Sequence, residues 1–219
     1  MSFFDLCVLY NNLIEKTLKR LRSLGFKYVG ISFSFDDRNL IREVKELGKE
    51  FGLEIFSRVD IEVNDPGQYH RLASKARRFF DLICVSKAPV NLLKGINLKK
   101  IALIDALVAS PRLVGKIRSM GMRIAVEFNF SKFFKALRAK SSFKVEGMIR
   151  NVTMLDSLNM PIVISSGAED PFEVIPPVQM VHTFSAIIGK REVNKKYIST
   201  IPQALIRNLM PLRWDVEGI

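Results

Sequence analysis

The residues best suited to chemistry are four carboxylates near the ends of strand-like segments: Asp60, Glu62, Asp105 and Glu127. Carboxylates grouped in this way serve as general acids and bases, or hold a divalent cation through oxygen. Barrel enzymes keep their catalytic groups at the carboxyl ends of strands, which is where these four residues are expected. A metal or acid/base site is therefore one interpretation of this set.

The competing interpretation is an internal ion-pair network. Alternation along EIFSRVDIEV puts Arg58 on the same strand face as Asp60, and the alternation in RIAVEFN puts Glu127 opposite an apolar face. A charge that points into a barrel must be paired, so Arg58 is expected to pair with Asp60 or Glu127. Nitrogen ligands are scarce, because only His70 and His182 are present, and both fall in predicted helices. These observations favour the network over catalysis.

A second candidate site is the run SSGA at residues 165–168, which ends the last predicted strand. Backbone amides in such a turn can cradle a phosphate. The plainer interpretation, which we favour, is a strand-to-helix turn with a Ser or Asp cap and a glycine at positive φ. The sequence contains neither G-x-x-x-x-G-K-[ST] nor G-x-G-x-x-G, and a G-x-S-x-G elbow is also missing.

The third candidate site is basic. The 219 residues carry a formal net charge of +12, and nearly all of the excess lies in the middle of the chain. Residues 61–140 hold 16 basic and 5 acidic side chains, against 10 and 9 in residues 1–60 and 8 and 8 in residues 141–219. A local positive field of this kind selects a polyanion through phosphate neutralisation. The alternative is a solvated surface of scattered lysines.

The predicted RNA-binding residues lie on several elements. On the helix after the third strand, Arg71, Lys75 and Arg78 follow spacings of four and three and form one face, here called the basic stripe. The apolar residues opposite the stripe are Leu72, Ala76 and Phe79. Residues 140–144 are predicted to form an exposed, flexible loop. The other predicted contacts are Lys87, Arg112, Lys116, Lys132, Lys135, Arg138, Lys140 and Lys144.

The elements that position these residues alternate from end to end. Strand-like runs are followed by segments with helical spacing, which indicates a parallel sheet with right-handed crossovers. Seven β/α units in this length favour an irregular (β/α) TIM-like barrel over an open doubly wound sheet, and we predict a single domain over residues 1–219. Residues 178–210 are expected to form two apolar helices with no strand between them, so an eighth strand is expected to be missing or very short. The predicted strands cover residues 4–10, 28–34, 54–63, 82–86, 100–107, 123–128 and 161–166.

Cysteine usage and hydropathy indicate the compartment. Cys7 and Cys84 lie far apart inside apolar runs, which is typical of buried free thiols and not of a disulfide or a zinc site. No apolar stretch approaches the roughly 20 residues of a membrane span, and no signal peptide is recognisable. We therefore expect a cytoplasmic protein that has no contact with a membrane.

Five segments of the sequence resemble one family. DLCVLYN in the first strand, RVDIEV in the third, LICVS in the fourth, IAVEFN in the sixth and PIVISSGAEDP in the seventh resemble the archaeal ribonuclease P protein component 3, over essentially the whole chain. The resemblance implies a distorted barrel related to the polymerase and histidinol phosphatase domain. It also implies a protein subunit of the ribonucleoprotein that removes the 5′ leader from precursor tRNA.

In that enzyme the RNA is the catalyst, and magnesium acts through the RNA. The resemblance therefore implies no cofactor on this chain and no catalytic residue. It implies binding to the ribonuclease P RNA together with a small Pop-type protein subunit and other ribonuclease P proteins, with precursor tRNA as the substrate of the assembly.

Two other classes of function stay open. Phosphatases of the related barrel begin their metal site with H-x-H in the first strand, where this chain reads FFDLCVLYN. A metal-dependent phosphoesterase of that type would need an oxygen-only site of Asp60, Asp105 and Glu127. The other class is a barrel that binds a protein partner and no RNA. A lipid-surface role is disfavoured, because the basic groups do not lie on one amphipathic helix.

Overall fold

The structure is a computed structural model that describes residues 2–95, 98–192 and 194–210. Seven strands form one sheet whose order follows the chain, and every neighbouring pair is parallel. The strands are β1 (Phe3–Leu9), β2 (Phe26–Ser32), β3 (Glu54–Glu62), β4 (Leu82–Lys87), β5 (Leu103–Asp105), β6 (Ala125–Asn129) and β7 (Ile162–Ser165).

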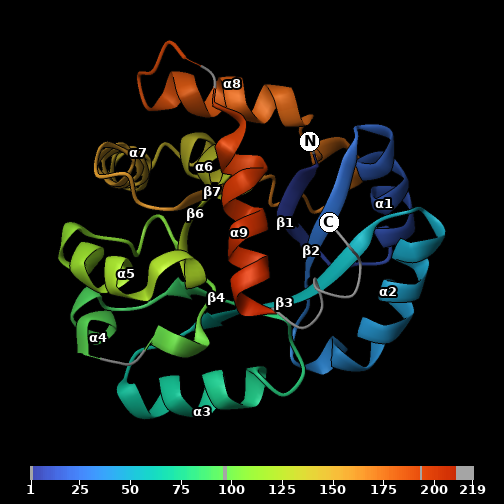
Figure 1. The fold of residues 1–219 in the computed structure, drawn as a ribbon, viewed down its shortest axis with the longest axis horizontal. Helices are drawn as coiled ribbons and strands as arrows, with labels where there is room; N and C mark the ends of the chain where they lie inside the picture. Colours follow the sequence, from blue (N-terminus) through green and yellow to red (C-terminus); the bar gives the residue numbers. More distant parts are fainter. Residues whose placement is uncertain (1, 96–97, 193, 211–219) are drawn as a thin grey trace.

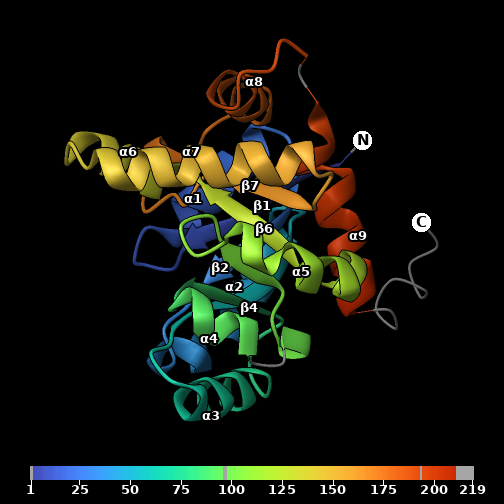
Figure 2. The ribbon, with the colours of Figure 1, turned by 90° about the vertical axis from the view of Figure 1, so that its left-hand side faces the viewer.

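Helices connect the strands and surround the sheet (Figures 1 and 2). They are α1 (Ile14–Ser23), α2 (Ile41–Glu50), α3 (Pro66–Ala76), α4 (Val90–Gly95), α5 (Val114–Met120), α6 (Phe130–Arg138), α7 (Ser142–Ser157), α8 (Pro177–Ile187) and α9 (Thr200–Leu209). Short 3-10 turns are η1 (Asp36–Leu40), η2 (Leu98–Lys100), η3 (Pro111–Leu113), η4 (Gly121–Arg123), η5 (Pro171–Glu173) and η6 (Lys195–Ile198).

The sheet closes into a barrel where β1 meets the residues that follow β7. Val8 forms a parallel bridge with Ala168. The backbone N–H of Gly167 donates to the carbonyl of Cys7, and that of Leu9 donates to the carbonyl of Ala168, both at 2.9 Å. The predicted irregular barrel with seven parallel strands is confirmed. After β7 the described residues form α8 and α9 without an eighth strand, as predicted.

The fifth strand is shorter than predicted. Residues 100–107 were expected to be extended, whereas β5 comprises Leu103–Asp105 only. The strand ends where Asp105 accepts a hydrogen bond from the backbone N–H of Leu107 at 2.8 Å, because this local bond turns the chain out of the sheet. The early end of β5 leaves the Asp105 side chain at the carboxyl end of the barrel.

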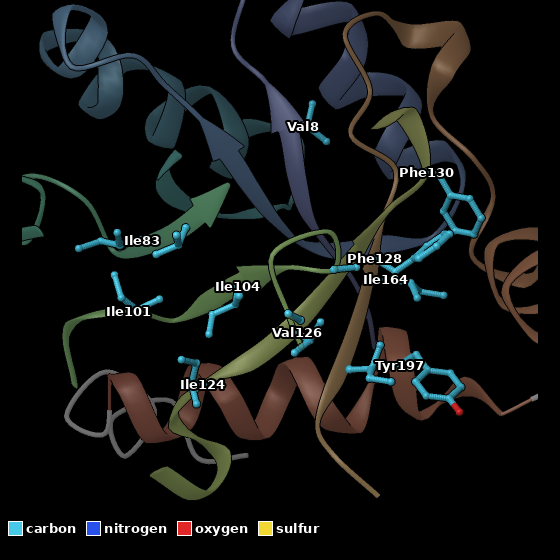
Figure 3. Packing of buried hydrophobic residues seen from close by; sticks show 14 of the residues in the cluster. Val8, Ile83, Ile101, Ile104, Ile124, Val126, Phe128, Phe130, Ile164 and Tyr197 are labelled. Atoms are coloured by element: carbon cyan, nitrogen blue, oxygen red, sulfur yellow. The ribbon is translucent and has the colours of Figure 1, made fainter. Parts of the chain in front are cut away.

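Apolar side chains form two layers. One fills the space between the sheet and the outer helices, and Figure 3 shows the part of it that includes Phe128, Ile164 and Tyr197. The other lies inside the amino-terminal half of the barrel, where Leu205 and Ile206 of α9 pack against the inward residues of the strands. Helix α9 therefore covers that end of the barrel (Figure 1), and the buried Arg58, Asp105 and Glu127 lie toward the opposite end, here called the mouth.

Candidate functional site

Arg58 lies at the centre of the mouth and is fully buried. Its guanidinium forms a bidentate pair with Glu127, at 2.5 Å from Nη1 to Oε1 and 2.6 Å from Nη2 to Oε2. Nη2 and Nε also donate to Oδ1 of Asp60, at 2.7 and 3.3 Å, and Nη1 donates to the carbonyl of Leu6 at 2.8 Å. These contacts use all the donor directions of the planar group. The predicted ion-pair network around Arg58 is confirmed, with both predicted partners.

Asp60 is held in its charged form. Burial alone would raise its pKa, but the adjacent Arg58 charge and its hydrogen bond outweigh burial and lower the pKa to about 2. Ser32 adds a hydrogen bond to Oδ2 at 2.7 Å. The carboxylate is thus ionised and fully engaged at neutral pH, so it has no capacity to act as a general acid or base there.

Asp105 pairs with a second cation, Lys132 of α6. The distance from Nζ to Oδ2 is 2.5 Å, and the Asp105 side chain is fully buried. Burial raises the pKa of Asp105, which Lys132 partly offsets, and the ion pair raises the pKa of Lys132 despite the burial of the ammonium. Three of the predicted carboxylates in the mouth, Asp60, Asp105 and Glu127, are therefore held by two cations, Arg58 and Lys132. This balance gives it no attraction for phosphate.

A backbone irregularity in β1 brings the Leu6 carbonyl to Arg58. The β1–β2 register shifts between Asp5 and Val8, and Gly30 of β2 lies directly beneath the shift. A Cβ at Gly30 would lie 2.4 Å from the Leu6 carbonyl oxygen, so only glycine fits there. The sequence analysis did not identify this requirement, because it depends on a contact between two strands.

Asp5 is a buried acid beside this irregularity. Its Oδ1 accepts from the backbone N–H groups of Cys7 and Ser166, at 3.2 and 3.1 Å, while Oδ2 has no hydrogen-bond partner among the described residues. Burial raises its pKa to about 6, although the hydrogen bonds lower it in part. Asp5 is thus a buried acid with a raised pKa beside the ion-pair network, and the sequence analysis missed it.

Three of the four predicted carboxylates meet in the mouth, and the fourth does not. Glu62 lies at the end of β3 with 65% of its side chain exposed, 3.5 Å from Lys87. The other three are committed to Arg58 and Lys132. Within the described residues there is no group of three or more His, Cys, Asp and Glu arranged to hold a metal ion. The phosphoesterase interpretation is therefore not supported, because cations of the chain itself occupy the oxygens that a metal would need.

The SSGA turn is a structural turn. Gly167 has φ of 67°, as the plainer interpretation predicts. Its backbone N–H closes the barrel, that of Ser166 donates to Asp5, and that of Ala168 donates to Ser166 Oγ at 3.2 Å. Asp170 caps the following η5 turn by accepting from two backbone amides. Since the amides are used within the fold, the turn does not offer them to a phosphate.

The predicted states of the cysteines and histidines agree with the structure. Cys7 and Cys84 are free and buried, and burial raises the pKa of both thiols, so neither is a reactive nucleophile. His70 in α3 and His182 in α8 lie in helices, as predicted, and both are exposed. They lie outside the mouth network.

The predicted RNA-binding residues do not form one patch. Arg71 and Lys75 of the basic stripe are exposed on α3, but Arg78 lies beyond the end of that helix, so the predicted single helix face does not include it. Arg138, Lys140 and Lys144 are exposed at the corner between α6 and α7. Figures 1 and 2 place α3 and this corner on different sides of the barrel. Arg112 is exposed on η3. The basic charge of residues 61–140 is therefore spread over the outer helices.

Four of the predicted residues have partners within the chain. Lys132 pairs with Asp105, Lys135 pairs with Glu169, and Lys87 makes the loose exposed pair with Glu62. Lys116 is partly buried and donates to the carbonyl of Leu93 at 3.0 Å. These partners are distant in sequence, so spacing along the chain did not reveal them. The three ion pairs reduce the charge that Lys87, Lys132 and Lys135 present to a polyanion.

Two local predictions around these residues are wrong. Residues 140–144 are not a loop throughout, because α7 begins at Ser142, so Phe143 and Lys144 lie in its first turn. Phe79 does not face the core: α3 ends at Ala76, and 44% of Phe79 is exposed while Phe80 is buried. The helical spacing used in the prediction does not extend past the end of the helix.

The structure adds a basic groove that the sequence analysis missed. It lies between α2 and the segment that follows α3, and it has a volume of about 470 Å³. Arg78 of the basic stripe lies on one side, and basic residues of η1 and α2 lie on the other. Those residues come from residues 1–60, where acidic side chains almost balance the basic ones, so charge counting gave no signal. The basic lining consists of Arg38, Arg42, Lys45, Lys49 and Arg78.

The fold and the site define a class: a seven-stranded (β/α) barrel whose mouth is filled by its own ion pairs and whose basic side chains lie on the outer helices. The family model described as RNase P subunit p30 matches residues 2–210. The chain belongs to this ribonuclease P subunit family, so the resemblance seen in the sequence is confirmed.

Individual proteins similar to this chain support the assignment to this family. The chain is 24% identical over 187 residues to a ribonuclease P protein component 3 of Methanococcus maripaludis strain C7, covering 80% of this chain and 78% of that protein. It is 23% identical over 225 residues to the component 3 of strain C5, with coverage of 98% and 94%. Among solved structures, a chain of archaeal ribonuclease P with mature tRNA has the same fold, with a TM-score of 0.70, 18% identity and coverage of 95% and 92%.

Proposed function

We propose that this chain is a protein subunit of ribonuclease P, the ribonucleoprotein that removes the 5′ leader from precursor tRNA. The observation that carries the proposal is the match of the p30 subunit family to residues 2–210, which include the whole described barrel. The related chain of known structure comes from archaeal ribonuclease P with mature tRNA.

In this proposal the barrel binds and stabilises the catalytic RNA and performs no chemistry itself. The filled mouth supports this division, because Arg58 and Lys132 engage the carboxylates that a hydrolase would use. Exposed basic residues on α3 and at the α6–α7 corner neutralise RNA phosphates. Magnesium acts through the RNA, and a small Pop-type protein is the partner that joins this chain on the RNA, alongside the other ribonuclease P proteins.

The assembly is proposed to work in the cytoplasm. Two buried free thiols fit a reducing compartment. None of the helices in the described part of the chain combines the length and hydropathy that a membrane crossing requires.

Purification of the tagged chain from its own cells tests the proposal, with an untagged strain as the control. We expect the ribonuclease P RNA to be enriched in the eluate, together with leader-removing activity that treatment with a nuclease abolishes. An eluate that lacks RNA but contains a protein partner would favour the barrel that binds protein alone. Phosphoester hydrolysis by the purified chain that Glu127→Gln abolishes would favour the enzyme.

A further inference from the structure

The groove between α2 and the segment that follows α3 is the strongest candidate for a defined RNA contact. Its basic side chains come from η1, from α2 and from the segment after α3, which the fold brings together, and two acidic residues, Glu46 and Glu54, share the lining. Its volume of about 470 Å³ lies within the range of roughly 300–1,000 Å³ found for pockets that bind small molecules, so one nucleotide unit fits.

The charges of the groove are only partly neutralised. Lys45 pairs with Asp81 at 2.6 Å, and Lys49 pairs with Glu46 at 2.9 Å. Arg42 and Arg78 are exposed and form no ion pair with any residue that the structure describes. Two guanidinium groups on opposite walls are therefore available to an anionic ligand, and such groups bind phosphate through paired donors.

An aromatic ring lies beside these charges. The backbone N–H groups of Phe79 and Phe80 both donate to the carbonyl of Ala76, which ends α3 in a tight turn. This turn directs Phe80 into the core and leaves Phe79 at the groove. The guanidinium carbon of Arg38 lies 5.4 Å from the centre of the Phe79 ring. The groove thus contains a partly exposed ring with a planar cation above it.

We infer that this groove binds an unpaired segment of RNA, with a nucleobase stacked on the Phe79–Arg38 pair and its phosphates on Arg42 and Arg78. The inference rests on the proposed function and specifies one site for it. Unpaired bases are recognised by stacking on aromatic rings and arginine planes, whereas a duplex offers mainly its backbone. An acidic peptide would satisfy the arginines but would leave the ring unused.

Binding of two labelled RNA probes to the full chain tests the stacking contact. The probes are a ten-nucleotide single strand and a blunt duplex of the same sequence, followed by fluorescence anisotropy. Phe79→Leu, which keeps the apolar bulk but removes the ring, should weaken single-strand binding about tenfold and leave duplex binding within about twofold. Phe79→Tyr, which keeps the ring, should bind the single strand like the wild type.

The charge contact has its own variant and control. Arg42→Gln combined with Arg78→Gln should lower the slope of log K against log salt by about 1.4 for the single strand, since each neutralised phosphate contributes about 0.7. The matched control changes two arginines that are exposed elsewhere, Arg150→Gln on α7 and Arg207→Gln on α9. It should leave the slope unchanged.

The outcomes separate this inference from the proposed function. If the wild-type chain binds the single strand and both groove variants bind it equally well, the groove assignment is wrong while the proposed function stands. If the groove variants keep their RNA affinity but no longer assemble with a protein subunit, the groove is a protein contact and the inference is overturned. A wild-type chain that binds neither probe and brings no RNA from cells would contradict both.

Discussion

Replacing Arg58 tests whether the mouth is a self-compensated network. Arg58→Met keeps the length of the side chain and removes its charge, which leaves the fully buried Glu127 side chain without its cationic partner. Removing one partner of a buried pair costs about 3–5 kcal/mol, because the remaining charge is stranded. The Leu6 carbonyl also loses a donor. We therefore expect the free energy of unfolding to fall by about 4 kcal/mol, a large part of the roughly 5–15 kcal/mol that stabilises a typical domain.

Two further variants resolve the cause of that loss. Arg58→Met combined with Glu127→Gln removes the more deeply buried of the two carboxylates that lose Arg58, so it should recover about 2 kcal/mol relative to Arg58→Met. Arg58→Lys keeps the charge but cannot form the bidentate fork, so it should lose about 2 kcal/mol. The assay is urea unfolding at pH 7.5 followed by circular dichroism. If Arg58→Met folds too poorly to measure, the comparison of Arg58→Lys with the double variant still tests the ordering.

The reasoning about Arg58 would be refuted by either of two results. A loss below about 1 kcal/mol for Arg58→Met would mean that Glu127 is protonated or reached by water in the folded protein. A double variant no more stable than Arg58→Met would mean that the loss comes from packing and not from the unpaired carboxylate.

Three other predictions follow from single sites. Because burial raises the pKa of Asp5 to about 6, its contribution to stability is present below about pH 4 and is lost as the pH rises through 6. The free energy of unfolding of Asp5→Asn, relative to the wild type, should therefore increase by about 3 kcal/mol between pH 4 and 8 in urea titrations. A difference that stays constant with pH would contradict the burial argument. Gly30→Ala should lower the free energy of unfolding by about 1–3 kcal/mol in thermal melts, because its Cβ would meet the Leu6 carbonyl. The control is Gly115→Ala, whose Cβ meets no atom within 4 Å and which should be neutral or stabilising. Equal effects of the two substitutions would argue against the close contact. Replacing the basic stripe with alanines should reduce the salt slope of binding to the cognate RNA by about 2–3, and an unchanged slope would exclude phosphate contacts on α3.

Much of the mouth was predictable, because local rules determine it. Strand alternation placed Arg58, Asp60 and Glu127 on inward faces, and a buried charge needs a partner, so the network followed from the sequence. The pairing of Lys132 with Asp105 did not follow, because it joins two elements through a contact that spacing along the chain does not encode. Asp5 was missed for the same reason, since its partners depend on the irregular register of β1.

The outer surface was less predictable. Whether a basic side chain is available to a ligand depends on its neighbours in space: Lys135 has a partner in Glu169, while Arg138 on the same helix is exposed. The groove depends on where α3 ends, because one residue more or less of helix would exchange the positions of Phe79 and Phe80. Helix ends are determined by capping and packing together, and the periodic pattern does not locate them closely.

Leader removal from precursor tRNA, measured across a magnesium titration, tests the central claim most directly. The reactions contain the ribonuclease P RNA alone, with this chain, with the small Pop-type partner, and with both proteins. We predict that both proteins together lower the magnesium needed for cleavage, because fixed Lys and Arg charges replace part of the ionic screening of the folded RNA. The chain without RNA should cleave nothing. A magnesium curve that the protein pair leaves unchanged would contradict the assignment of this barrel as an RNA-stabilising subunit.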